Sequence, residues 1–98
     1  MSDYFPVVVQ AVPGEGRNVY AYFSDGSTHL FDMSHLIAQG GVFAPLQDAD
    51  YFRERLTVMN DTIAWDVSGC FDPTQCIDID PFAVYEAPVV TDPLAEAS

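Results

Sequence analysis

The stretch from Asn18 to Met33 constrains the fold most, because two runs of aromatic and β-branched residues flank Asp25-Gly26 in it. Asp-Gly between two such runs predicts a β-hairpin, since glycine adopts positive φ without steric cost and aspartate tolerates it. With a two-residue loop, the facing pairs are Phe23 with Thr28, Tyr22 with His29, Ala21 with Leu30 and Tyr20 with Phe31. Both faces then carry large apolar groups, so we expect other elements or a second chain to cover each face.

Three further segments have the composition of strands. The β-branched run Phe5–Val12 ends at a Pro-Gly turn, and Cys76–Asp80 alternates apolar and polar residues. Leu56–Asp66 predicts a second hairpin that turns at Asn60-Asp61. In that register Val58 faces Ile63 and Leu56 faces Trp65.

Two short helices are expected between the hairpins. The first is Ser34–Gln39, capped by Ser34 and stopped by Gly40-Gly41, and an extended link over Val42–Leu46 follows it. The second is Ala49–Arg55, capped by Asp48, with one of its two aromatic residues facing inward and the other at the rim.

These elements predict one α+β domain over residues 1–85. Its antiparallel sheet consists of two hairpins plus an N-terminal strand, and one or two short helices pack on it. Residues 86–98 contain prolines, small residues and acids without a periodic apolar face, and predict a flexible acidic C-terminal tail.

The charge balance restricts the partners. Fifteen acidic residues stand against three arginines and no lysine, which gives a formal net charge of −12. Such a chain is repelled by nucleic acid and by anionic membranes, whereas it attracts basic proteins and divalent cations. The acidity also has a simpler interpretation, which is solubility. No apolar run is long enough to span a bilayer, the N-terminus lacks the basic region of a signal peptide, and two cysteines make no disulfide framework, so we expect a cytoplasmic protein.

A series of motifs, taken in order, resembles a known family. The motifs are FSDG (Phe23–Gly26), FDM (Phe31–Met33), FAPLQDADYF (Phe43–Phe52), IAW (Ile63–Trp65) and the later Asp72-Pro73 and Cys76-Ile77-Asp78. They are similar to those of the small bacterial proteins known as domain of unknown function 2442. The resemblance implies an α+β fold with a curved antiparallel sheet. It also implies a lone domain, a fusion to a helix-turn-helix, or a pairing that looks like a toxin–antitoxin module; it brings no catalytic residues.

Four aspartates raise the hypothesis of a divalent-metal site. Carboxylates on a glycine-containing loop are calcium ligands, and the acidic segment contains Asp66, Asp72, Asp78 and Asp80. The spacing differs from that of an EF-hand loop, and no glutamate stands at the bidentate position. The alternative is that these aspartates cap turns and accept backbone N–H groups.

The cysteines and histidines give no recognised catalytic or zinc pattern. Cys70 and Cys76 have neither redox nor zinc-finger spacing, and a pairing between them is expected only in an oxidising compartment. A Cys/His nucleophile pair with His29 or His35 is disfavoured, because the acidic surroundings raise the pKa of a thiol. We therefore expect no cofactor and no enzymatic activity.

The aromatic residues remain as candidates for recognition. In the predicted register Tyr20, Tyr22 and His29 share one face of the hairpin, and tyrosine is a frequent interface anchor. We therefore expect a non-enzymatic protein-binding module whose partner is another protein. The most specific form of this hypothesis is an antitoxin-like pairing with a small basic protein. Alternatives are a homodimer, docking at an exposed edge strand, and a calcium-binding domain that uses Asp66, Asp72, Asp78 and Asp80.

Overall fold

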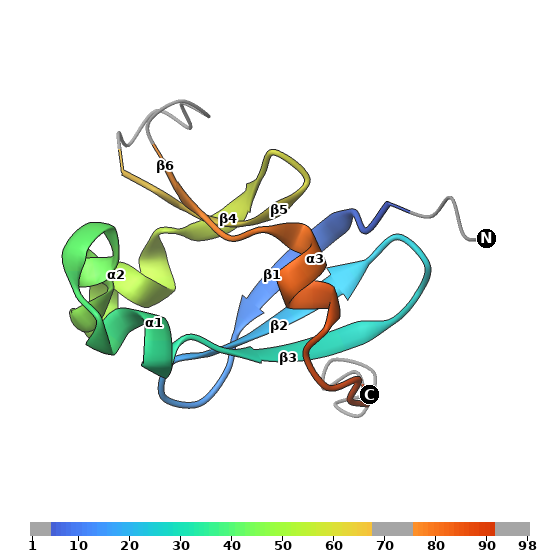
Figure 1. The fold of residues 1–98 in the computed structure, drawn as a ribbon, viewed down its shortest axis with the longest axis horizontal. Helices are drawn as coiled ribbons and strands as arrows, with labels where there is room; N and C mark the ends of the chain where they lie inside the picture. The colour runs from blue at the N-terminus through green and yellow to red at the C-terminus, as the bar shows by residue number, and fades with distance from the viewer. Residues whose placement is uncertain (1–4, 68–75, 92–98) are drawn as a thin grey trace.

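The computed structural model describes residues 5–67 and 76–91, and within them the chain forms two three-stranded antiparallel sheets with short helices (Figure 1). Sheet A contains β1 (Val8–Pro13), β2 (Asn18–Phe23) and β3 (Thr28–Asp32). Sheet B contains β4 (Leu56–Met59), β5 (Thr62–Asp66) and β6 (Cys76–Asp78). The predicted α+β class is confirmed.

The first hairpin forms at Asp25-Gly26, but its predicted register is wrong by one residue. Tyr22 lies opposite Thr28, and Ala21 lies opposite His29. The loop has three residues rather than two, because the N–H of Phe23 donates to the carbonyl of Ser27 at 2.9 Å. Gly26 takes a φ of +90°, which suits a turn followed by a left-handed residue. Since side chains alternate along a strand, a shift of one residue places every β3 side chain on the other face.

The second hairpin has the predicted register, with Val58 opposite Ile63 and Leu56 opposite Trp65. Its turn residues Asn60 and Asp61 both have positive φ, +56° and +63°. That combination is a type I′ turn, whose twist matches the twist of the flanking strands. Asparagine and aspartate reach this conformation without glycine because their short polar side chains tolerate it.

The helices follow the predicted caps in part. α2 (Ala49–Glu54) begins at Asp48, whose carboxylate accepts the N–H groups of Asp50 and Tyr51. α1 (Ser34–Ala38) is not capped by Ser34 as predicted: Met33 is the N-cap residue, and the carboxylate of Asp32 accepts the N–H of Ser34 at 2.8 Å. The capping group thus comes from two residues upstream.

Two other segments differ from the prediction. The expected extended link lies inside the 3-10 helix η1 (Gly41–Gln47), which begins after Gly40 at a φ of +73°. α3 (Pro81–Tyr85) was not predicted, although it carries the typical start signal of an aspartate cap, Asp80, followed by proline. The Asp80 carboxylate accepts the N–H of Phe82 at 2.9 Å.

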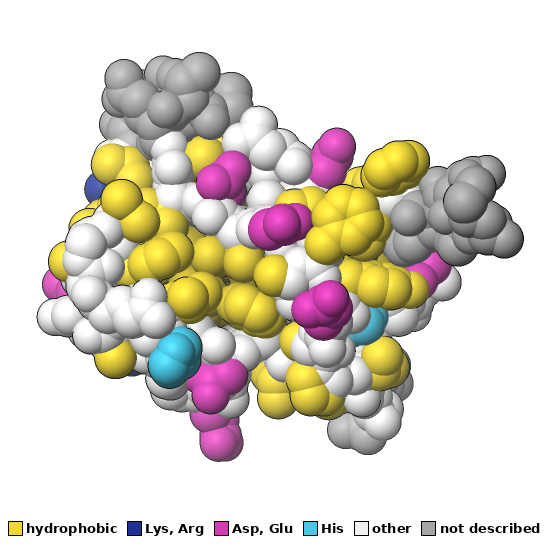
Figure 2. All heavy atoms as spheres, in the orientation of Figure 1, with side chains coloured by type: hydrophobic (Ala, Val, Ile, Leu, Met, Phe, Trp, Pro, Cys, Tyr) yellow, Lys and Arg dark blue, Asp and Glu magenta, His cyan; other side chains and the backbone are white. Residues whose placement is uncertain are grey.

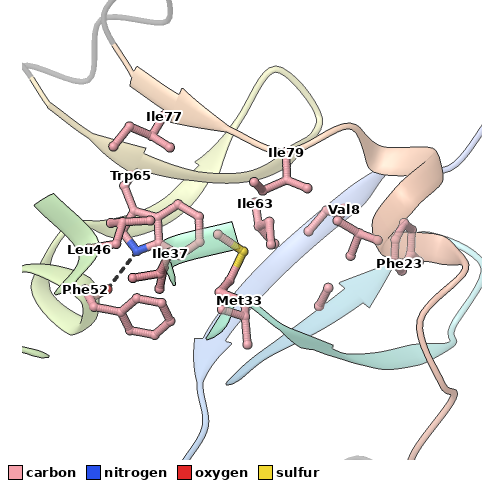
Figure 3. Close-up of a cluster of buried hydrophobic side chains, with 13 residues drawn as sticks. Val8, Phe23, Met33, Ile37, Leu46, Phe52, Ile63, Trp65, Ile77 and Ile79 are labelled. Atoms are coloured by element: carbon pink, nitrogen blue, oxygen red, sulfur yellow. Dashed lines mark hydrogen bonds between the residues drawn. The ribbon is translucent and has the colours of Figure 1, made fainter. Parts of the chain in front are cut away.

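One hydrophobic core lies between the two sheets and the helices (Figure 3). Sheet A contributes Val8 and Phe23, sheet B contributes Ile63 and Trp65, and Met33 extends between them. The helices add Ile37, Leu46, Phe52 and Val84. The indole N–H of Trp65 donates to the carbonyl of Phe52 at 2.8 Å, so the largest core side chain has its polar atom satisfied.

The chain after α3 returns to sheet A, so the predicted start of the tail at residue 86 is too early. The N–H of Leu30 donates to the carbonyl of Pro88, and the N–H of Val90 donates to the carbonyl of Thr28, at 3.0 and 2.9 Å. His29 and Val89 form an antiparallel bridge. We call residues 86–90 the C-terminal strap. The rest of the predicted tail, residues 92–98, lies outside the described residues.

The turn at Asn60-Asp61 gives a test of the fold. Replacing Asp61 by glycine removes the cost of a side chain at positive φ, and should raise the free energy of unfolding by up to about 1 kcal/mol. Urea denaturation measures this change. Gly26→Ala is the matched control with the opposite sign: at a φ of +90° the new Cβ meets open space, so its cost is conformational only. Destabilisation by Asp61→Gly would contradict the turn assignment.

Candidate partner-binding surface

The face of sheet A that points away from the core carries a group of apolar and aromatic side chains. Residues that pair across antiparallel strands share a face, and the strand pairs of β1, β2 and β3 therefore give two rows. These rows are Gln10, Tyr22 and Thr28, and Val12, Tyr20 and Leu30. We call these six residues the outer face of sheet A.

Solvent reaches most of this face. Val12, Tyr20, Tyr22 and Leu30 are half-buried and Gln10 is exposed, whereas the alternate residues of β2 are buried in the core. The helices pack on the core side, because α1, α2 and α3 contribute their buried residues to the core. A half-exposed sheet face with two tyrosines is the kind of surface that binds another protein.

The turn before β2 approaches one of these tyrosines closely. The ring of Tyr20 lies close to Gly14, because a Cβ added at residue 14 would lie 3.0 Å from its Cε2 atom. Real Cβ atoms rarely approach so closely, so a side chain at this position would require the ring to shift by a few tenths of an ångström. The close approach of the Tyr20 ring to the Pro13-Gly14 turn therefore depends on a residue without a side chain at position 14.

The structure separates the three residues that were predicted to share a partner-binding face. Tyr20 and Tyr22 lie on the outer face of sheet A, but His29 pairs with Ala21 and points to the opposite side. His29 is only 3% exposed. The prediction of a common face is wrong because it assumed a two-residue loop. Leu30 and Thr28 take the place of His29 beside the tyrosines, and the two-residue spacing of Asp25 and Ser27 is the signal of the longer loop.

His29 instead belongs to a polar cluster at the tip of the first hairpin. We call Asp25, Ser27, His29 and Tyr85 the hairpin-tip cluster. The Tyr85 hydroxyl donates to Asp25 Oδ2 at 2.7 Å, and Asp25 Oδ1 lies 2.6 Å from Ser27 Oγ. Ser27 Oγ lies 3.0 Å from His29 Nε2, and His29 Nδ1 lies 2.8 Å from the carbonyl oxygen of Ala87. The cluster therefore joins β3 and its preceding turn to α3 and the C-terminal strap.

Hydrogen bonds lower the pKa of Asp25 to about 2. The hydroxyl of Ser27 is the largest cause, followed by the hydroxyl of Tyr85 and the N–H of Ser27. All three groups donate to the ionised carboxylate and so favour it over the protonated form. The pKa of Asp32 is also lowered, because its carboxylate accepts the N–H of Ser34.

The aspartates of the predicted metal site do not assemble among the described residues. Asp66 is buried at the end of β5, Asp78 is exposed on β6 beside Asn60, and Asp80 caps α3. Within residues 5–67 and 76–91 no three acidic, histidine or cysteine side chains come together to hold a metal ion. Asp72 lies outside the described residues, so the calcium hypothesis stays a prediction.

The cysteine hypotheses stay untested in the same way. Cys76 is half-buried at the start of β6, where it pairs with Asp66, and Cys70 lies outside the described residues. Of the two histidines, His35 is exposed on α1 and His29 is buried in the hairpin-tip cluster, so they do not form a common site. The described part of the chain contains no detectable pocket.

Two of the three arginines are held by the protein's own backbone. Arg17 donates from Nε to the carbonyl of Leu46 at 3.0 Å and from a terminal nitrogen to that of Gln47 at 2.6 Å. Arg55 donates to the carbonyl of Asp66 at 3.3 Å. The carboxylates are dispersed over the surface; on the face with α1 and α3, acidic side chains surround a central apolar zone (Figure 2). The exterior therefore presents negative charge to an approaching molecule.

A second apolar patch lies near α3. Phe82 is 51% exposed and Phe5 is 71% exposed, and their rings meet edge to face with centroids 6.3 Å apart. This patch consists of two side chains, whereas the outer face of sheet A places four half-buried apolar residues on neighbouring strands. The outer face of sheet A carries more apolar side chains than the Phe5–Phe82 pair and is the better candidate of these two for recognition.

Comparison with protein families shows to which family the chain belongs. The family model described as "Protein of unknown function (DUF2442)" matches residues 8–88, which span nearly all of the described fold. The chain belongs to this family, as the motif series suggested. The match extends into the C-terminal strap, in agreement with the return of the chain to β3. Searches of curated proteins and of solved structures give no match.

Among residues 5–67 and 76–91, no helix combines the length and the apolar character that crossing a bilayer requires.

Removal of the Tyr85 hydroxyl tests the hairpin-tip cluster. Tyr85→Phe deletes a donor to Asp25, so the pKa of Asp25 should rise from about 2 toward the ordinary value of 3.8. The folded-state pKa is lowered, so the bonds to Asp25 contribute stability above pH 3.8, and this contribution is lost as the pH falls toward 2. A carbon-13 NMR titration of the aspartate carboxyls measures the shift. Tyr51→Phe is the control, and an unchanged Asp25 titration in Tyr85→Phe would disprove the contact.

Proposed function

We propose that this protein is a non-enzymatic protein-binding module that docks its partner on the outer face of sheet A. The observation that supports the proposal is the pair of rows on that face, in which Val12, Tyr20, Tyr22 and Leu30 stay half-buried on neighbouring strands. A flat apolar face of this kind loses unfavourable water contact when a second protein covers it.

The side chains on this face suit an interface. Tyrosine buries a large ring at low entropic cost, and its hydroxyl forms hydrogen bonds at the edge of a contact. The strands hold Tyr20 and Tyr22 in place before binding, and the Tyr20 ring lies close to Gly14. Little conformational entropy is then lost when the partner binds.

The charge of the chain indicates that its partner is basic. The net charge of −12 favours a partner with basic side chains around an apolar centre, since complementary charge accelerates encounter. Asp32 pairs with Asn18 at the end of the same face and supplies a carboxylate at its rim. A small basic protein meets both requirements. An antitoxin-like pairing in the bacterial cytoplasm is the most specific form of the proposal.

Paired variants test the surface. The double variant Tyr20→Thr/Tyr22→Thr keeps β-branched residues in the strand but removes both rings. Wild type and variant, both tagged, are used to capture proteins from native lysate at low and high salt, and the captured basic protein is then purified and titrated against each. We expect at least a tenfold loss of affinity in the double variant, since each lost anchor costs about 1–2 kcal/mol, and weaker binding to the wild type at high salt.

Phe82→Ala is the matched control, because it removes an exposed aromatic ring from a different surface. The control should bind as the wild type does. Equal binding by wild type and the double variant would disprove docking on the outer face. Recovery of the chain itself, with a dimer mass in ultracentrifugation that the double variant lacks, would replace the basic partner with a second copy on the same face.

A further inference from the structure

We propose that the edge of β3 that faces away from β2 is a binding site for an extended, basic segment of a partner protein, and that the C-terminal strap occupies this site until such a segment displaces it. We call this edge the β3 edge. The inference rests on the proposed function for the basic character of the partner alone. The site is the backbone of one strand and is distinct from the outer face of sheet A.

The strap shows that the β3 edge binds an extended segment. The N–H of Leu30 donates to the carbonyl of Pro88 at 3.0 Å. The N–H of Val90 donates to the carbonyl of Thr28 at 2.9 Å. A peptide that adds a strand to a sheet is held by main-chain hydrogen bonds of the same kind. The strap is therefore bound as such a peptide would be.

A side chain of β3 adds a third contact to the backbone of the strap. His29 Nδ1 lies 2.8 Å from the carbonyl oxygen of Ala87, and because a carbonyl only accepts, Nδ1 is the donor. The ring is buried and packs against Phe23 and Tyr85, with centroids 4.9 and 4.7 Å away, which restricts its orientation. The β3 edge thus presents a main-chain donor and a side-chain donor to the carbonyls of a bound segment.

The strap uses the β3 edge incompletely at Pro88. In an antiparallel ladder, two residues that form a hydrogen-bonded pair exchange two bonds, one in each direction. Leu30 and Pro88 form such a pair, since the Leu30 N–H donates to the Pro88 carbonyl. Proline has no N–H and cannot return the second bond to the Leu30 carbonyl. A segment with another residue at this position can form both bonds.

Charge and α3 limit the strap at its N-terminal end. His29 and Val89 form an antiparallel bridge, and continuing its register by three residues places the position of Glu86 opposite Asp32. Like charges on facing positions repel each other. Glu86 is instead the C-cap residue of α3, so the strap does not reach the exposed Asp32. A basic residue at this position of an incoming segment would pair favourably with Asp32.

The same register determines which side chains an incoming segment adds to the outer face of sheet A. Cross-strand neighbours share a face, so the position of Pro88 lies beside Leu30 on that face. The position of Val90 lies beside Thr28 in the same way. Apolar residues at these two positions extend the apolar rows of the outer face. The site therefore fits a segment with one basic residue followed by two apolar residues at alternate positions.

A synthetic peptide titrated into the full chain and followed by NMR tests the site. The peptide Lys-Ala-Val-Val-Val-Thr-Lys follows the strap from position 86 to position 91, with lysine in place of Glu86 and valine in place of Pro88. A matched peptide carries proline instead of the third valine and lacks the N–H that donates to Thr28. The strap competes from the same chain at an effective concentration on the order of millimolar, so the titration extends into that range.

The first peptide should shift the backbone amides of Leu30 and Thr28, and the amides of the β4–β5 hairpin should stay unchanged. The matched peptide should bind about three- to tenfold more weakly, as expected for the loss of one hydrogen bond. Equal binding of the two peptides, or the absence of shifts at Leu30 and Thr28 in the wild type and in the opened variant Val90→Pro, would overturn the proposal.

Two strap variants change the competition in opposite directions. Val90→Pro removes the N–H that donates to Thr28, so the affinity for the first peptide should rise about three- to tenfold. Val89→Pro is the matched control, because the N–H of Val89 points away from β3 and its loss should leave the affinity unchanged. Glu86→Lys/Pro88→Val gives the strap the features of the peptide and should lower the affinity about tenfold.

The variants also separate this inference from the proposed function. Tyr20→Thr/Tyr22→Thr alters the outer face but keeps the β3 edge, so it should bind the peptide as the wild type does, whatever its effect on the partner. An affinity for the peptide that is equal in the wild type, Val90→Pro and Glu86→Lys/Pro88→Val would show that the strap does not occupy the peptide site, and would overturn the proposal.

Discussion

The structure depends on the burial of one core between two small sheets, neither of which could exclude water from its inner face alone. A three-stranded sheet gains independent stability only when another element covers its apolar side. Here the inner faces of sheets A and B cover each other, Met33 lies between them, and Trp65 packs against Phe52 of α2. The N–H of Val8 donates to the carbonyl of Asp61 at 2.9 Å and joins the sheets at their common edge. With the inner faces used in this way, most side chains on the opposite side of sheet A are half-buried or exposed among the described residues.

Local chemistry explains which parts of the fold could be predicted from the sequence. The turn at Asn60-Asp61 and the cap at Asp48 depend on side chains within a few residues, and both were predicted correctly. The compact conformation of Gly41–Gln47 depends instead on distant contacts, since Arg17 binds the carbonyls of Leu46 and Gln47 and the Leu46 side chain enters the core. The start signal of α3 is present at Asp80-Pro81, but the alternation of apolar and polar residues over Cys76–Asp80 assigns Asp80 to a strand.

The candidate site shows the same division. Alternation along β2 places Tyr20 and Tyr22 on one side whatever the hairpin register, so their common face was predictable. The residues of β3 that lie beside them were not predictable, because a two-residue and a three-residue loop at Asp25-Gly26 differ by one residue. The two loops place His29 on opposite faces of the sheet. The bonds from Tyr85 to Asp25 and between His29 and Ala87 connect segments 60 and 58 residues apart in the sequence, and follow only from the folded chain.

The three-residue loop also limits how this hairpin can change during evolution. Its length determines which set of alternate β3 residues faces the core, since Phe31 packs against the core while Leu30 points to the other side. Deletion of one loop residue would exchange the faces of these two sets of residues. His29 and Phe31 would then be exposed, and Thr28 and Leu30 would turn inward. Substitutions within the loop leave this arrangement intact. Homologous hairpins should therefore differ in the identity of their loop residues much more readily than in their number.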